Sequence, residues 1–266
     1  MRLLLTSAFA LLLVAPVSAQ LAAPNAAGVT FAHVHVNVVD IELHKQLWVE
    51  HFGGEVVQKG SLVTVKFPNF LLVLTEREPT GGSQGSALDH FGFKVPDIEA
   101  VHEKWRAAGY EVQAEFTGTE GFNNSYLIAP DGIRFELQED TTLEQQAIGY
   151  HVHFWHPEYE ELLDWYVDMF DAVKRQRGRT ATTADVPGMN MSFQGCRTEC
   201  VATQGRAIDH IGFEVENLEE FANMLVERGV EFQLMPRYIE SIELTIAFFV
   251  DPAGVRVELT EGFDKY

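Results

Sequence analysis

The feature that most constrains the fold of this chain is a nine-residue segment that occurs twice. Residues 87–95 read Ala-Leu-Asp-His-Phe-Gly-Phe-Lys-Val, and residues 207–215 read Ala-Ile-Asp-His-Ile-Gly-Phe-Glu-Val. Both copies alternate between an apolar position and a polar or small one, which is the period of a β-strand with one buried face. Each histidine therefore lies on the side of its strand that faces away from the packed side.

Two further copies turn this pair into a fourfold repeat. In each copy a histidine precedes the residue that opens a helix by seven positions, and the four pairs are His33 and Asp40, His90 and Asp97, His151 and Glu158, and His210 and Asn217. Each predicted helix is followed by signals for three short strands. Four copies of one supersecondary unit are the economical interpretation, so the sequence predicts an α+β fold of four βαβββ units. We expect a first domain at 30–140, a linker at 141–148 and a second domain at 149–263.

The third unit departs from the other three. It has Pro157-Glu158 where the others carry Asp or Asn, so the start of its helix is less well defined. We expect its three strands at residues 172–176, 179–184 and 189–194.

The N-terminus has the pattern of a secretory signal. Arg2 is followed by an apolar run from Leu3 to Val14 and by the small-residue exit Val17-Ser18-Ala19. Residues 1–19 are therefore predicted to be cleaved, residues 20–29 to form a leader, and the protein to be exported to a periplasmic or extracellular location. No later segment approaches the roughly 20 apolar residues of a membrane span, so we expect no membrane association after cleavage.

Charge and cysteine content narrow the possible partners. The chain has 39 acidic residues against 19 basic ones, a net charge of −20, which disfavours binding to nucleic acid. The two cysteines, Cys196 and Cys200, are expected either to close a small disulfide loop or to remain two free thiols. The sequence is compatible with a monomer and with a homo-oligomer.

The repeated histidines are matched by a repeated acid. The last strand of the second unit carries Glu136 and that of the fourth carries Glu258, both on the polar side. Two neutral imidazoles and one carboxylate from separate strands form a ligand set that leaves positions open for substrate, which suits Fe2+ or Mn2+ and also admits Zn2+ or Ni2+. We predict two metal sites, one in each half, and the sets are His33, His90 and Glu136, and His151, His210 and Glu258.

The alternative is that these six residues are ordinary polar side chains on the wet faces of amphipathic strands. His35 and His153 lie on the same faces, two residues along. They are candidates for contacts to the ligands or to substrate, or simply line a cavity.

The closing segments of the units add a family resemblance. Residues 130–136, Pro-Asp-Gly-Ile-Arg-Phe-Glu, and 251–258, Asp-Pro-Ala-Gly-Val-Arg-Val-Glu, together with the histidine seven residues before the helix, resemble the vicinal oxygen chelate superfamily. Its members include glyoxalase I, extradiol dioxygenases and bleomycin-resistance proteins. The resemblance implies two domains with curved mixed sheets, one groove per half between paired units, and a small substrate that chelates the metal through two oxygens.

Within that superfamily, the residues at two positions distinguish the types of site. Glyoxalase I has a further carboxylate ligand where this chain has Val73 and Ser192, which disfavours a glyoxalase I site and favours a three-ligand, dioxygenase-like one. Extradiol dioxygenases carry a tyrosine ten residues before the liganding glutamate. Tyr126 occupies that place in the first half and is the candidate catalytic residue, whereas Phe248 occupies it in the second.

One element of the ring-cleaving dioxygenases is not found. Neither half has a histidine at the position of their acid/base residue, and His102, which lies on a helix, is expected to face solvent. The leading prediction is an exported metal-dependent enzyme acting on a small oxygen-chelating substrate. The alternatives are a glyoxalase-type lyase or isomerase, and a metal-free or non-catalytic protein that sequesters a small molecule.

Overall fold

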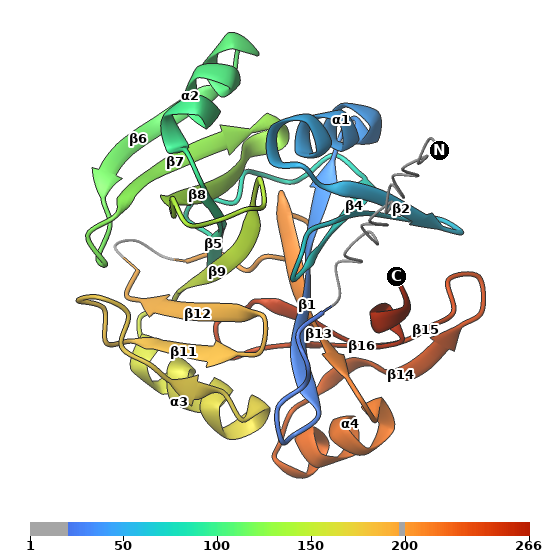
Figure 1. The fold of residues 1–266 in the computed structure, drawn as a ribbon. Coiled ribbons are helices and arrows are strands. Elements are labelled where there is room, and N and C mark those ends of the chain that lie inside the picture. The colour runs from blue at the N-terminus through green and yellow to red at the C-terminus, as the bar shows by residue number, and fades with distance from the viewer. Residues whose placement is uncertain (1–20, 197–199) are drawn as a thin grey trace, which may run out of the picture.

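The computed structural model describes residues 21–196 and 200–266 and contains four units of strand, helix and three strands (Figure 1). The predicted signal peptide lies outside the described residues. Unit 1 comprises β1 (Val29–Val38), α1 (Ile41–Phe52), β2 (Glu55–Lys59), β3 (Leu62–Lys66) and β4 (Leu71–Glu76). Unit 2 comprises β5 (Leu88–Val95), α2 (Ile98–Ala107), β6 (Glu111–Thr117), β7 (Asn123–Ala129), the 3-10 turn η1 (Pro130–Gly132) and β8 (Ile133–Glu139). Unit 3 comprises β9 (Ile148–Trp155), α3 (Tyr159–Phe170), β10 (Val173–Lys174), β11 (Thr183–Val186) and β12 (Met189–Gln194). Unit 4 comprises β13 (Ile208–Val215), α4 (Leu218–Glu227), β14 (Phe232–Ile239), β15 (Leu244–Val250), β16 (Arg256–Glu261) and the 3-10 turn η2 (Phe263–Lys265).

Side-chain caps fix the start of three of the four helices. Asp40 accepts a hydrogen bond from the backbone N–H of Leu43, and Asp97 and Asn217 make the equivalent bond three residues on. At α3 the residue in the cap position, Glu158, makes no such bond. The third unit, whose sequence differs from the others at this position, therefore lacks the side-chain cap of its helix.

The units pair in a different order from the one predicted. The strands form two eight-stranded mixed sheets, of order β14-β15-β16-β13-β1-β4-β3-β2 and β10-β11-β12-β9-β5-β8-β7-β6. Unit 1 therefore pairs with unit 4 through antiparallel β1 and β13, and unit 2 pairs with unit 3 through antiparallel β5 and β9. The short connection between β8 and β9 lets unit 3 fold back beside unit 2, which leaves units 1 and 4 to pair with each other (Figure 1).

One hydrophobic core joins the two sheets. Although α1 belongs to unit 1, its Trp48 and Phe52 pack on the sheet of units 2 and 3, where Phe52 stacks on Phe93 with ring centroids 5.2 Å apart and Trp48 meets Phe135 at 5.3 Å. Burying such a side chain contributes about 1.5–3 kcal/mol. The helix thus ties the two sheets together.

Unit 3 also differs in its outer strands. Only two residues form β10, and residues 175–182, which include the end of one predicted strand and the start of the next, form a loop. The loop folds on itself through hydrogen bonds between Arg177 and Thr180, and the N–H of Arg179 donates to Thr119 Oγ1 in the β6–β7 hairpin, at 2.8 Å. These bonds replace the strand pairing that the sequence pattern had indicated. Just after β12, Cys196 and Cys200 form a disulfide, which resolves the two alternatives.

Candidate metal centres

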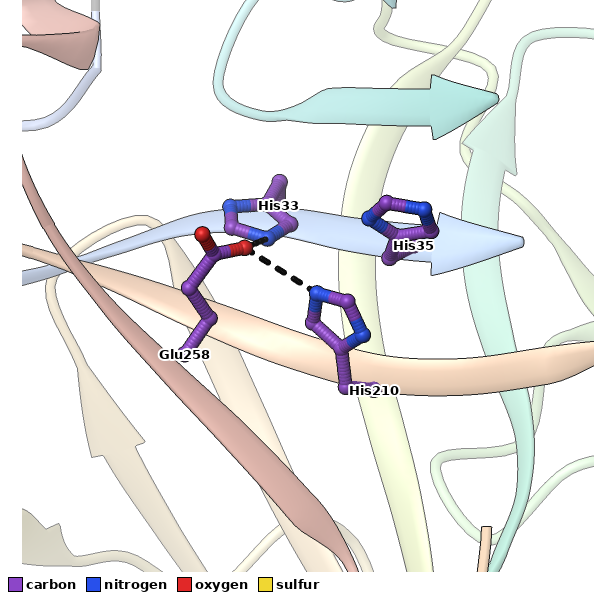
Figure 2. A group of neighbouring side chains, drawn as sticks. All are labelled: His33, His35, His210 and Glu258. Carbon is purple, nitrogen blue, oxygen red and sulfur yellow. Dashed lines mark hydrogen bonds and ion pairs between the residues drawn. The ribbon is translucent and has the colours of Figure 1, made fainter. Parts of the chain in front are cut away.

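Two clusters of histidine and glutamate lie on the polar faces of the sheets. Centre A consists of His33, His35, His210 and Glu258 (Figure 2), and centre B consists of His90, His151, His153 and Glu136. Possible ligand atoms from all four residues of centre A, and from the three histidines of centre B, lie within 4.8 Å of one another. Both centres have the residue types that bind divalent transition metals.

Three adjacent strands assemble centre A. His33 comes from β1, His210 from β13 and Glu258 from β16, and the two-residue period of each strand turns these side chains to the same face. A single oxygen, Glu258 Oε2, lies 3.0 Å from Nε2 of His33 and 3.0 Å from Nε2 of His210 (Figure 2). All three residues are buried.

Centre B repeats this geometry in the other sheet. Glu136 Oε2 lies 3.1 Å from His90 Nε2 and 3.4 Å from His151 Nε2. The other oxygen of Glu136 accepts a hydrogen bond from the side-chain amide of Asn124, at 2.6 Å. His153 Nδ1 lies 3.3 Å from His90 Nε2.

The structure corrects how the six predicted ligands are grouped. His33 was expected with His90 and Glu136, and it lies instead with His210 and Glu258, while His151 joins His90 and Glu136. The reason is the pairing of unit 1 with unit 4 and of unit 2 with unit 3. Each centre therefore takes one histidine from one half of the chain and a histidine and a glutamate from the other.

An aspartate directly before one histidine of each centre holds that ring in place. His210 Nδ1 lies 2.6 Å from Asp209 Oδ1, and His90 Nδ1 lies 2.7 Å from Asp89 Oδ1. Because an ionised carboxylate only accepts hydrogen bonds, each Nδ1 is the donor and Nε2 faces the centre. Arg256 contacts Asp209, at 3.2 Å from Nη1 to Oδ1, and Arg134 contacts Asp89. The repeated Asp-His pair is visible in the sequence, but the alternation of the strand does not by itself indicate that the aspartate orients the ring.

A glycine makes room for the other histidine of each centre. Gly212 on β13 lies opposite His33 on β1, and a Cβ atom at residue 212 would come within 1.9 Å of His33 Cε1. In the same way Gly92 lies opposite His151, and a Cβ there would come within 2.5 Å of its Cε1. The glycine in each copy of the repeated segment therefore serves a histidine of the partner unit.

The protonation states of the ligands fit a bound cation. Burial lowers the pKa of His33 and lowers that of His151 to about 4, so both rings are neutral at pH 7. Burial acts to raise the pKa values of Glu258 and Glu136, but the adjacent histidines outweigh it and hold both well below the usual value. Two ionised carboxylates thus face imidazole lone pairs.

Burial also lowers the pKa of His90 and of His210, but their paired carboxylates outweigh this effect, and the net shift is upward. The hydrogen bond to the preceding aspartate is the largest of these upward contributions. A cation between the histidine and the glutamate would replace the proton on Nε2.

The spacing of the polar atoms tests this fit further. Nδ1 of His33 and Nδ1 of His151 are buried and have no hydrogen-bond partner, and Nε2 of each ring lies beside a glutamate oxygen without the geometry of a hydrogen bond. The separations of 3.0–3.4 Å between histidine nitrogen and glutamate oxygen are close to the roughly 3 Å expected between neighbouring ligands that are each about 2.1 Å from one ion. Both ligand sets therefore fit a divalent metal.

The surroundings distinguish the two centres. Beside His33 and His35, strand β4 places the apolar side chains of Leu71 and Val73, and Phe263 packs on the His33 ring with centroids 5.1 Å apart. The corresponding positions beside His151 and His153 on β12 are polar. They are Asn190 and Ser192. Centre A is thus covered by a hydrophobic cluster, whereas centre B has polar neighbours.

Tyr126 lies at centre B. It is opposite Glu136 in the β7–β8 pair, and its ring is 5.1 Å from that of His90. The Arg134 guanidinium lies over the Tyr126 ring, 3.7 Å from its centroid. In centre A, Phe248 takes the equivalent place under Arg256, so that centre has an aromatic ring there without a hydroxyl.

His35 and His153 were predicted to lie on the same strand faces as the candidate ligands, and they do. His35 Nε2 lies 2.7 Å from Thr75 Oγ1, and His153 lines a cavity beside centre B. The expectation that His102 faces solvent was wrong, since it is buried and its Nε2 lies 2.8 Å from Ser125 Oγ. Its helix turns this face toward β7, which the helical spacing alone did not identify.

The similarity of the chain to known proteins agrees with this architecture. Residues 30–137 match the model of the Glyoxalase/Bleomycin resistance protein/Dioxygenase superfamily. The structure resembles that of glyoxalase I from Zea mays, with a TM-score of 0.69 and 17% identity over 89% of this chain and 94% of that one. It also resembles a candidate dioxygenase from Bacillus subtilis, with a TM-score of 0.61 and 10% identity over 92% of this chain and 88% of that one.

At these identities the resemblance is one of fold. No curated protein sequence matches the chain significantly. None of the helices in the described part of the chain is long and apolar enough to cross a membrane. The family match over residues 30–137 and the shared fold agree with the resemblance to the vicinal oxygen chelate superfamily that the repeated histidines and glutamates indicate.

Proposed function

We propose that this protein is an exported metal-dependent enzyme that acts on a small organic substrate able to chelate the metal through two oxygens. The observation that carries the proposal is that in each centre two imidazoles converge on one carboxylate oxygen and the Nδ1 of one of these rings is buried without a hydrogen-bond partner. A protein that only sequesters a ligand has no need of such a set. With three protein ligands, positions remain open for substrate, and the set favours Fe2+ or Mn2+ over Zn2+ or Ni2+.

We assign turnover to centre B. His153 and Ser192 line a cavity of about 520 Å³ beside it, a volume typical of small-molecule sites. In centre A the comparable space next to His33 holds Phe263 and Leu71. This difference supports a catalytic role for centre B and a structural role for centre A.

The protein groups at centre B suit an oxygen-rich substrate. A metal bound there supplies a Lewis acid that polarises the chelated oxygens. Burial, followed by the charge of Glu136, raises the pKa of the Tyr126 hydroxyl, which therefore stays protonated at neutral pH and able to donate to a substrate oxygen. Arg134, stacked on the Tyr126 ring, fixes its position.

Export is part of the proposal. It is supported by the signal-like N-terminus and by the Cys196–Cys200 disulfide, a bond that persists in oxidising compartments. Cell fractionation with an antibody to the protein tests it. Recovery of the full-length chain from the cytoplasm alone would contradict export.

Elemental analysis of residues 20–266, purified without chelator, tests the enzyme proposal. We expect about one or two equivalents of metal per chain, with His151→Ala removing metal from centre B and His210→Ala removing it from centre A. Oxygen uptake with catechols and turnover of 2-oxoaldehydes are then measured on all three proteins, and we expect only His151→Ala to abolish activity.

Two results would overturn this proposal. A wild-type protein that neither contains metal nor takes up added Fe2+, Mn2+, Zn2+ or Ni2+ would remove the basis for an enzyme and favour a sequestering protein. Activity that disappears with His210→Ala but survives His151→Ala would assign turnover to centre A instead.

A further inference from the structure

The loop between β10 and β11 buries an arginine beside centre B. Arg177 is only 7% exposed, and two of its guanidinium nitrogens, Nε and Nη1, are buried without a hydrogen-bond partner. Within residues 21–196 and 200–266 it forms no ion pair. An arginine is always charged, and burying a charge without a partner costs several kcal/mol.

The contacts around Arg177 balance this charge only in part. Its guanidinium lies 4.8 Å from the centre of the Tyr150 ring, and a cation–π contact is weaker than an ion pair with a carboxylate. The acid in this neighbourhood is Glu120, but its carboxylate accepts hydrogen bonds from the Tyr150 hydroxyl and from Gln138 Nε2. These donors are neutral, so Glu120 keeps its charge and offsets that of Arg177 in part, but it forms no ion pair with Arg177 and leaves Nε and Nη1 without an acceptor.

Arg177 forms part of the wall of the cavity beside centre B. The same cavity of about 520 Å³ is lined by His153 and Ser192 at the centre and by Arg179. Tyr150, under the guanidinium, precedes His151 in the chain, and the two rings are 4.9 Å apart. A molecule bound at centre B therefore has a buried cation within reach across the cavity.

The loop holds the arginine in a defined position. Arg177 exchanges two backbone hydrogen bonds of 2.9 Å with Thr180, and Arg179 is bonded to Thr119 in the opposite hairpin. The equivalent connection in unit 1, between β2 and β3, is the two-residue turn Gly60-Ser61. The buried arginine is thus a feature of centre B and has no counterpart at centre A in the described chain.

We propose that this cavity binds a carboxylate group through Arg177, so that the substrate of centre B is an organic acid that also carries the two chelating oxygens. The role in turnover rests on the proposed function, but the binding of the carboxylate does not. A carboxylate in the cavity would neutralise the guanidinium and accept charge-assisted hydrogen bonds. Arg179, at the same cavity, adds to the positive potential in a chain whose net charge is −20.

The test uses metal-free mature protein, so that chelation plays no part. Isothermal titration calorimetry compares benzoate with benzyl alcohol, a neutral molecule of nearly the same shape. We expect benzoate to bind at least about tenfold more tightly, since a hydrogen bond to a charged group contributes about 1.5–3 kcal/mol.

Variants assign the preference to the buried arginine. We expect Arg177→Met to lose it and Arg177→Lys, which keeps the charge, to retain part of it. Arg175→Met is the matched control, because Arg175 lies in the same loop and is paired with Asp185. Circular dichroism of each variant tests whether it is folded. If Arg177→Met does not fold, the comparison of the wild type with Arg177→Lys still tests the site.

The outcomes separate this inference from the proposed function. Equal affinities for benzoate and benzyl alcohol, or a preference that survives Arg177→Met, would overturn the carboxylate site even in a protein that binds metal. Tighter binding of inorganic phosphate than of benzoate would overturn the assignment to a carboxylate. A protein that prefers benzoate through Arg177 but binds no metal would support the site and refute the proposed enzyme.

Discussion

The glycine in each repeated segment gives a sharp test of how the centres are built. In Gly212→Ala the new methyl group would lie 1.9 Å from His33 Cε1, whereas carbon atoms in contact are about 3.5–4.0 Å apart. The ring must therefore move by roughly 1.5 Å or rotate away. Metal–ligand distances tolerate only about 0.2 Å, so we expect His33 to leave the ligand set of centre A.

The expected magnitudes follow from this displacement. Changing an outer partner of a ligand weakens metal binding by about 10–100-fold, so displacing the ligand itself should cost centre A at least about 100-fold. Overpacking of the sheet should also lower the free energy of unfolding by about 1–3 kcal/mol. In Gly92→Ala the closest approach, to His151 Cε1, is 2.5 Å, so the same effects should appear at centre B in milder form.

Competition with a chromophoric chelator measures the affinity of each centre, and urea denaturation measures stability. Gly195→Ala is the control, because its nearest contact would be 3.4 Å, an ordinary separation. In the double variant of Gly212→Ala with His33→Ala, the methyl group no longer meets a ring. This protein should regain much of the lost stability but not the metal. Unchanged stoichiometry and affinity in Gly212→Ala would refute the proposed packing.

Three further predictions concern pairing, positioning and pH. We expect the double variant His33→Ala/His210→Ala to lose one metal site and the double variant His33→Ala/His90→Ala to lose both, as measured by metal stoichiometry. The reverse pattern would contradict the pairing of unit 1 with unit 4 in one centre and of unit 2 with unit 3 in the other. We expect Asp209→Asn to weaken metal binding at centre A by about 10–100-fold in the chelator assay, because its carboxylate orients the adjacent ring, and an unchanged affinity would count against that role. Burial raises the pKa of Glu214 from 4.5 to about 7, so the folded chain holds a proton that the unfolded chain has released, and the associated stability is present below about pH 4.5 and lost as the pH rises through 7. The melting temperature measured by calorimetry should thus fall less steeply between pH 5 and 8 in Glu214→Gln than in the wild type, and equal slopes would disprove this.

Local chemistry explains what the sequence predicted correctly. Asp40 and Asp97 cap helices through bonds that span three residues, and the alternation around His90 and His210 depends only on the period of a strand. Such features are encoded within a few residues. The α+β class, the fourfold repeat and the strand faces of the candidate ligands are therefore predictable from the amino-acid sequence alone.

The pairing of the units is not a local property. Four similar first strands present four similar edges, and nothing in the alternation around His33 says whether β1 should pair with a strand of unit 2 or of unit 4. The pairing depends on contacts between residues far apart in the chain, and the packing of Trp48 and Phe52 on the sheet of units 2 and 3 is one of them. The grouping by halves failed for this reason, although the six residue types were correctly chosen.

Arg177 shows a second limit. In the sequence it belongs to the run Lys174-Arg175-Gln176-Arg177, which resembles an exposed basic edge, and one of its neighbours, Arg175, is indeed largely exposed and paired with Asp185. Only the turn closed by Thr180 carries Arg177 inward. A burial that depends on loop geometry leaves no periodic pattern to detect.

The two centres have ligands of the same residue types but differ in the side chains that surround them. Leu71 and Phe263 beside His33 leave apolar surface where a substrate would have to enter, and displacing them would expose that surface to water at about 25 cal/mol per Å². Ser192 and Arg177 beside centre B instead offer polar groups, one of them a guanidinium with two nitrogens that have no hydrogen-bond acceptor. A cation in centre A would then gain mainly from holding β1 to β13 and β16, whereas one in centre B would meet a cavity already prepared for an anion. If the proposed function holds, the same fold supports a stabilising centre and a reactive one, and the difference between them lies in the neighbouring strand and loop rather than in the ligands.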